Sequence, residues 1–90
     1  MEPILQAFKS LELKLFSSDD VHVLFSPETL QLFHLNSTSA RVLRDIWADN
    51  DLIAVASRYG MPEEKLRAFL GGVVYSVETS RPVVRERGNL

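Results

Sequence analysis

FSPETLQLFHLNSTSARVLRDIW, residues 25–47, is the stretch of sequence that decides the fold. Its first part, residues 26–29, predicts a turn, because the ring of Pro27 fixes φ near the value that the second turn position requires. Large apolar side chains on both faces then predict a β-strand over Leu30–Leu35. Asn36 or Ser37 can accept a hydrogen bond from the first free N–H groups of a helix. The stretch therefore predicts a strand that passes directly into an amphipathic helix.

Two further strands are predicted upstream of this junction. Leu11, Leu13 and Leu15 alternate with Glu12 and Lys14, and period two is typical of a strand with one buried face. A polar turn over residues 17–20 separates it from a second strand over residues 21–25, which is rich in β-forming residues. Three short strands with tight connections indicate an antiparallel meander.

Three helices are predicted after the strands. The first has a wide apolar stripe, and residues 49–51 end it, so that Asp51 can cap the second helix. Gly60 supplies the left-handed residue that commonly ends a helix, and Pro62 suits the start of the third. The apolar residues at helical spacing are Ala40, Val42, Leu43, Ile46 and Trp47 in the first helix, Leu52, Val55, Ala56 and Tyr59 in the second, and Leu66, Phe69, Leu70, Val73, Val74 and Val77 in the third.

Gly71 and Gly72 interrupt the third helix at a cost of about 1 kcal/mol each relative to alanine. We expect a close approach of another backbone there to compensate. The order is βββααα, which predicts a single α+β domain over residues 11–78. Residues 1–10 are either a helical turn packed on this domain or an arm that docks on a partner, and residues 79–90 are expected to be a flexible tail.

Composition limits the possible functions. The chain has 90 residues, a net charge of −2 and no cysteine, which leaves no disulfide, thiolate nucleophile or cysteine zinc site. The charge gives no strong attraction to nucleic acid or to anionic membranes. No apolar run approaches the ~20 residues that a membrane span needs, and no secretory signal opens the chain. We expect a cytoplasmic protein.

FHLNSTSARVLRDIW, residues 33–47, resembles the Leu-Asn-containing segment of the PqqD-like family, peptide chaperones of pyrroloquinoline quinone biosynthesis. That family is the prototype of the RiPP recognition element, a small winged-helix-like domain of pathways that modify ribosomally made peptides. The resemblance extends over residues 21–77, and Leu35-Asn36 is its most specific part. It departs from the family at residues 49–51, where Asp-Gly is common, and after the third helix.

The resemblance implies a function in natural product biosynthesis without catalysis or a cofactor. Such domains bind the leader segment of a precursor peptide and present it to a separate modifying enzyme, often a radical S-adenosylmethionine enzyme. The leader adds as an antiparallel strand to the edge of the third strand, in a groove against the third helix. Carried over to this chain, the peptide-binding residues are Leu30, Gln31, Leu32, Phe33, His34, Lys65, Leu66, Arg67, Phe69, Leu70, Val73 and Val74.

The residues themselves are compatible with strand addition. Soluble proteins usually protect an edge strand with lysine, proline or a bulge, and residues 30–35 contain neither lysine nor proline. We expect Phe33 and Leu35 to face the core, with Leu30, Leu32 and His34 nearer the groove. Lys65 and Arg67 could meet acidic residues of a leader. The alternative, in which the third helix is simply a well-buried core helix, is equally compatible with its apolar residues.

The sequence contains no recognisable catalytic or metal-binding motif. His22 and His34 have no potential ligand at a typical spacing, and there is no phosphate-binding loop or nucleophile elbow. A winged helix-turn-helix DNA-binding protein is the main alternative, although Glu63 and Glu64 at the start of the third helix would repel phosphates. A third possibility is an interaction subunit that binds a partner through Ile4, Leu5 and Phe8, or a homodimer that pairs edge to edge.

Overall fold

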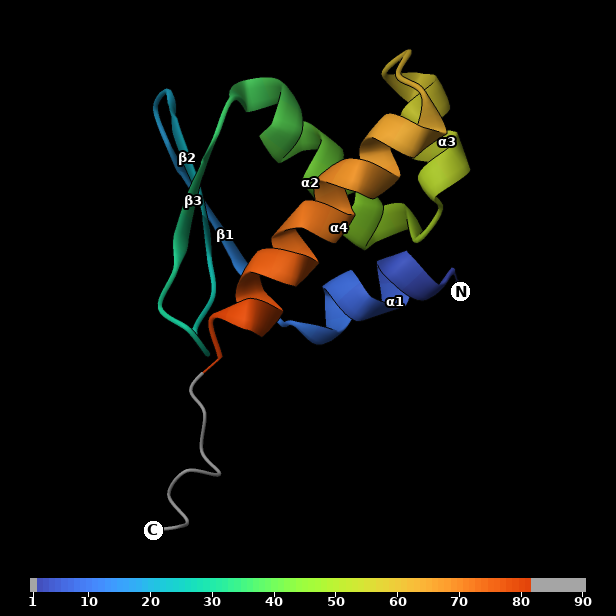
Figure 1. The fold of residues 1–90 in the computed structure, drawn as a ribbon. Helices are drawn as coiled ribbons and strands as arrows, with labels where there is room; N and C mark the ends of the chain where they lie inside the picture. The colour runs from blue at the N-terminus through green and yellow to red at the C-terminus, as the bar shows by residue number, and fades with distance from the viewer. Residues whose placement is uncertain (1, 82–90) are drawn as a thin grey trace, which may run out of the picture.

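The computed structural model describes residues 2–81 and consists of a small sheet with helices packed on one side (Figure 1). Three antiparallel strands are followed by three helices, as predicted for an α+β domain, and a short helix precedes them. The elements are α1 (Pro3–Ser10), β1 (Lys14–Ser18), β2 (Val21–Phe25), β3 (Leu32–Leu35), α2 (Ser37–Asp49), α3 (Leu52–Arg58) and α4 (Glu63–Thr79). The predicted tail lies outside the described residues from position 82 onward.

The sheet has the order β1-β2-β3, so β2 is central and β3 is an edge strand. Asp19 and Asp20 form the two-residue turn between β1 and β2, and Asp19 takes a left-handed φ of 52°, which aspartate tolerates. In the centre of the sheet Leu15, Leu24 and Phe33 are cross-strand neighbours on the face that meets the core. The sheet therefore packs on the helices through one face only, mainly against α2.

The first strand begins three residues later than predicted. Leu11 forms the C-terminal cap of α1, with its N–H 3.2 Å from the carbonyl of Phe8, and Glu12 has a left-handed φ of 54°. Leu11 and Leu13 are buried as expected, but they belong to the connection between α1 and β1. Their alternation reflects burial on one side of a loop, which periodicity alone cannot distinguish from a strand.

The third strand also begins later than predicted, at Leu32. Leu30 has a φ of 64°, and its N–H donates to the carbonyl of Ser26 at 2.7 Å, which keeps it in the turn. The predicted turn forms around Ser26, which is fully buried. Its hydroxyl oxygen lies 2.9 Å from the hydroxyl of Thr29 and accepts that hydrogen bond. A buried polar side chain satisfied within its own turn holds this connection rigid.

The predicted helix boundaries are confirmed by their caps. The Asn36 side chain accepts a hydrogen bond from the N–H of Ser39 at 2.8 Å, and Asp51 accepts one from Ala54 at 3.1 Å. Gly60 has a φ of 64°, as expected for the residue after α3. These local interactions place α2 directly after β3 and α4 after a short turn.

Residues 3–10 form a packed helix, the first of the two alternatives for the N-terminal segment. Leu5 and Phe8 are fully buried, and α1 lies alongside α4 (Figure 1). The Phe8 ring is 5.4 Å from the ring of Trp47 in α2, at an angle of 35°. Because Leu5 and Phe8 are in the core, the idea that they form a docking surface for a partner is wrong for this conformation.

The expected close approach at the glycine pair of α4 is not found. A Cβ atom on Gly71 would lie 3.8 Å from the side chain of Ile4, an ordinary contact, and one on Gly72 would meet nothing within 4 Å. No neighbouring backbone therefore requires either glycine. Gly72 instead leaves an open position on the helix surface.

A polar cluster joins α2 to α3. Asp45 accepts hydrogen bonds from the hydroxyl of Tyr59 at 2.7 Å and from Arg58 at 3.0 Å, and Arg58 also pairs with Asp49 at 2.9 Å. The Tyr59 hydroxyl, followed by the Arg58 guanidinium, lowers the pKa of the Asp45 carboxyl. The cluster therefore fastens the C-terminal end of α3 to α2.

Candidate functional site

The open edge of β3 is the first component of the candidate site. Within residues 2–81 this strand pairs only with β2. The N–H of Ser26 donates to the carbonyl of Gln31 at 3.0 Å, so these two residues form a hydrogen-bonded pair. The next pair along the ladder is Phe25 and Leu32. Since bonded and non-bonded pairs alternate in an antiparallel ladder, Leu32 and His34 direct their backbone N–H and C=O groups away from β2.

The side chains of β3 alternate as predicted. Phe33 and Leu35 pack against the core, whereas Leu32 and His34 are exposed, as is Leu30 in the preceding turn. The register places Leu32 and His34 on the sheet face that points away from the helices. Their backbone groups thus belong to the open edge, but their side chains do not face α4.

One stripe of α4 reaches the residue that precedes this strand. Lys65, Phe69, Gly72 and Ser76 lie at spacings of four, three and four residues, which puts them on one side of a helix. At one end, the Ser76 hydroxyl accepts a hydrogen bond from the side chain of Gln31 at 3.1 Å. We call Lys65, Phe69, Gly72 and Ser76 the α4 stripe. It spans about 16 Å at 1.5 Å per residue, close to the length of about five extended residues.

An apolar hollow of about 140 Å³ lies at the other end of the stripe. It opens between the first turn of α2, which directly follows β3, and the first half of α4. Met61 and Phe69 are its partly exposed apolar side chains, whereas Leu66 is buried, and Lys65 adds one positive charge. The residues that line it are Thr38, Ser39, Val42, Met61, Lys65, Leu66 and Phe69.

The predicted site residues divide into two groups. Lys65, Leu66 and Phe69 line the hollow, and Gln31, just before β3, contacts the other end of the α4 stripe. Leu70, Val73 and Val74 are buried in the core and face away from this region. The large apolar surface of α4 that suggested a groove is used mostly for packing against α1 and α3.

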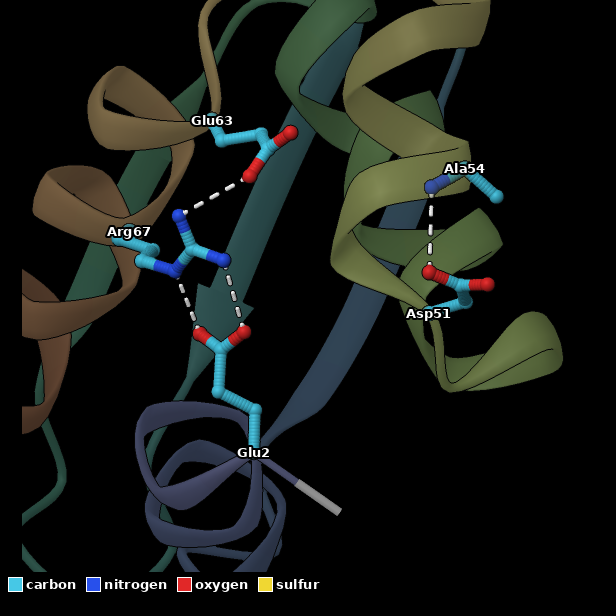
Figure 2. A network of polar contacts seen from close by, with 5 residues as sticks. All are labelled: Glu2, Asp51, Ala54, Glu63 and Arg67. Carbon is cyan, nitrogen blue, oxygen red and sulfur yellow. Dashed lines mark hydrogen bonds and ion pairs between the residues drawn. The ribbon is translucent and has the colours of Figure 1, made fainter.

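Arg67 is also turned away from the α4 stripe, toward α1. Figure 2 shows its guanidinium between two carboxylates. It donates two hydrogen bonds to Glu2, of 2.6 and 2.9 Å, and pairs with Glu63 at 3.3 Å through its remaining nitrogen. Hydrogen bonding to Arg67 lowers the pKa of the Glu2 carboxyl, and Glu2 raises the pKa of Arg67 in return. Arg67 therefore fastens the start of α1 to α4 and leaves Lys65 as the basic side chain of the hollow.

The prediction missed the residues that complete the site. Thr38, Ser39 and Val42 come from α2, and Met61 comes from the turn before α4. The spacing of the α4 stripe, including Ser76, was visible in the sequence as a repeat at one helical face. The contribution of α2 was not visible, because it depends on the angle at which α2 leaves β3.

Comparison with known proteins gives no match to a family model, a curated protein or a solved structure. Among residues 2–81 there is no group of three or more histidine, cysteine or acidic side chains placed to hold a metal ion. None of the helices in the described part of the chain combines the length and apolar character that a membrane span requires.

Proposed function

We propose that this protein is a peptide-binding module that takes up an extended segment of a precursor peptide as a fourth strand on β3. The open edge of β3, with the hydrogen bond between Gln31 and Ser76 of the α4 stripe beside its start, carries the proposal. Leu32 and His34 offer outward N–H and C=O groups, the pattern that main-chain recognition of a peptide uses. The peptide would run antiparallel to β3 and alongside α4 over a matching length.

The hollow would set side-chain specificity. In an added strand, alternate side chains point to the same face. Those on the helix-facing side would meet the α4 stripe, and a large apolar one would fill the hollow between Met61, Leu66 and Phe69. Lys65 at its edge favours an acidic residue nearby in the peptide. The resemblance to RiPP recognition elements supports the same function, in which the peptide is a leader segment presented to a separate modifying enzyme. In this proposal the modifying enzyme is a radical S-adenosylmethionine enzyme.

DNA binding is less well supported. In a winged helix-turn-helix protein α4 would be the recognition helix, and its first turn carries Glu63 and Glu64. Arg67, one turn further, is occupied by Glu2. The N-terminal end of α4, which would have to enter the major groove of DNA, therefore presents no basic surface.

The test is a comparison of His34→Pro with His34→Ala. Proline removes the outward N–H and adds a ring at the open edge, while the ladder to β2 loses no donor. Alanine removes the imidazole and keeps the N–H, so it is the matched control. The ligand would be a synthetic peptide of the leader segment encoded beside this gene, labelled and titrated by fluorescence anisotropy.

We expect His34→Pro to weaken binding at least tenfold, a loss of about 1.4 kcal/mol or more, since it removes one hydrogen bond and obstructs the edge. His34→Ala should bind within about threefold of the unchanged protein. Far-ultraviolet circular dichroism would establish that both variants fold. Equal affinities for the proline and alanine variants would refute strand addition on β3.

A further inference from the structure

The outer face of the sheet carries a second apolar surface, whose side chains the proposed function does not use. Its residues are Phe16, Val21, Val23, Phe25 and Leu32, which we call the outer-face patch. Phe16 and Leu32 each expose 59% of their surface and Val21 exposes 57%. The one-sided sheets of soluble proteins usually present polar side chains to water. Contiguous exposed apolar residues on a strand face are therefore typical of an interaction site.

The register shows that these residues are contiguous. Phe16 and Val23 are cross-strand neighbours, as are Phe25 and Leu32, and all lie on the face opposite Leu24. The helices lie on the other side of the sheet (Figure 1). No described element covers the patch within one copy of the chain.

Charges at the two ends of the patch indicate what covers it. Lys14 is the first residue of β1. It lies on the outer face, because its cross-strand partner Phe25 does. Asp19 and Asp20 form the turn at the opposite end of the same strand. A two-fold axis across the strands would stack β1 on β1 in opposite directions and bring Lys14 of each copy to the aspartates of the other. We propose that a second copy of this chain docks on the outer-face patch and forms a face-to-face homodimer.

The size of the face sets the expected affinity. Three strands of up to five residues cover roughly 17 by 14 Å, or about 240 Å², so two such faces would bury roughly 500–600 Å² in total. This is below the size of a standard specific interface, so we expect a weak dimer with a dissociation constant on the order of 100 μM. Such a dimer would form and dissociate with concentration.

The dimer and the peptide site are separable. Phe16 lies on β1, two strands away from the open edge of β3. A face-to-face dimer therefore leaves that edge and the hollow accessible in both copies, which would give a bivalent particle. This arrangement differs from pairing through the edge of β3, which would block peptide uptake.

Sedimentation equilibrium of the full chain from about 2 to 200 μM is the test, and it spans the expected dissociation constant. We expect Phe16→Ser to leave a monomer at the highest concentration. Tyr75→Ser on α4, which exposes 71% of its surface and lies outside the outer-face patch, is the matched control and should dimerise as the unchanged chain does. A monomer at all concentrations, or a dimer unaffected by Phe16→Ser, would overturn the proposal.

A charge exchange tests the orientation. Lys14→Asp and Asp20→Lys should each weaken the dimer about fivefold or more, and the double variant should recover most of this loss. If the loss of dimer affinity in the double variant equals the sum of the losses in the two single variants, the antiparallel arrangement is wrong. Loss of the dimer in His34→Pro but not in Phe16→Ser would instead identify edge pairing and would overturn the proposal.

Discussion

Gly72→Ala should stabilise this protein, although it changes a glycine in the middle of a 17-residue helix that packs in the core. An alanine Cβ at this position would meet nothing within 4 Å, so it would introduce no clash. Glycine is about 1 kcal/mol less favourable than alanine inside a helix, because the unfolded chain loses more conformational freedom there. The expected gain in the free energy of unfolding is therefore about 1 kcal/mol.

For a domain of this size such a gain raises Tm by roughly 4–8 °C, which thermal unfolding followed by circular dichroism would resolve. Gly60→Ala is the matched control, because it adds the same methyl group in equally open space but at a φ of 64°. That substitution should lower stability by about 1 kcal/mol. The two variants differ only in backbone conformation, so their opposite signs isolate this effect.

The same position reports on the candidate site. Gly72→Leu retains most of the helix-propensity gain, but its side chain would occupy the open part of the α4 stripe, where the peptide is proposed to lie. We expect stability at or above that of the unchanged chain together with at least tenfold weaker peptide binding. Destabilisation by Gly72→Ala would refute the open environment, and unaltered peptide affinity in Gly72→Leu would refute the use of this stripe.

Two further predictions concern strain and charge. Leu30→Gly should stabilise the fold by about 0.5–1 kcal/mol, because Leu30 holds a left-handed φ of 64° with an exposed side chain, and chemical denaturation would measure the gain. An unchanged or lower midpoint would contradict this. Glu2→Gln should lower stability at neutral pH. Because the folded pKa of Glu2 is lowered, the stabilisation is present above its ordinary value of 4.5 and is lost as pH falls through the folded value. The two proteins should therefore converge in acid, and a constant difference down to low pH would contradict the Arg67 pairing.

Local chemistry in the sequence determined much of the fold. The caps at Asn36 and Asp51 and the left-handed Gly60 depend on neighbouring residues only, and they set the helix boundaries as predicted. Alternation in β3 likewise assigned Phe33 and Leu35 to the core, because a strand that continues into a capped helix has little freedom to change its facing.

Packing between distant elements decided what periodicity left open. Leu11 and Leu13 have the alternation of a strand, yet the contact of α1 with α4 places them in a connection. Arg67 was predicted to line the peptide groove because it is basic and lies on the third helix. In the structure it pairs instead with Glu2, 65 positions away, at the start of α1. Nothing in the local sequence specifies such a pair, because its energy exists only once α1 has docked.

The candidate site combines both kinds of information. The sequence alone determined that residues 32–35 form a strand without lysine or proline to protect its edge. Only the tertiary structure decided that, within residues 2–81, no further strand pairs with β3 and that α2 and α4 leave an apolar hollow between them. The facing of Leu32 is set by alternation, but its exposure depends on which elements cover the sheet. That outcome is determined by helices far away in the chain, which pack on one face and leave the other to solvent.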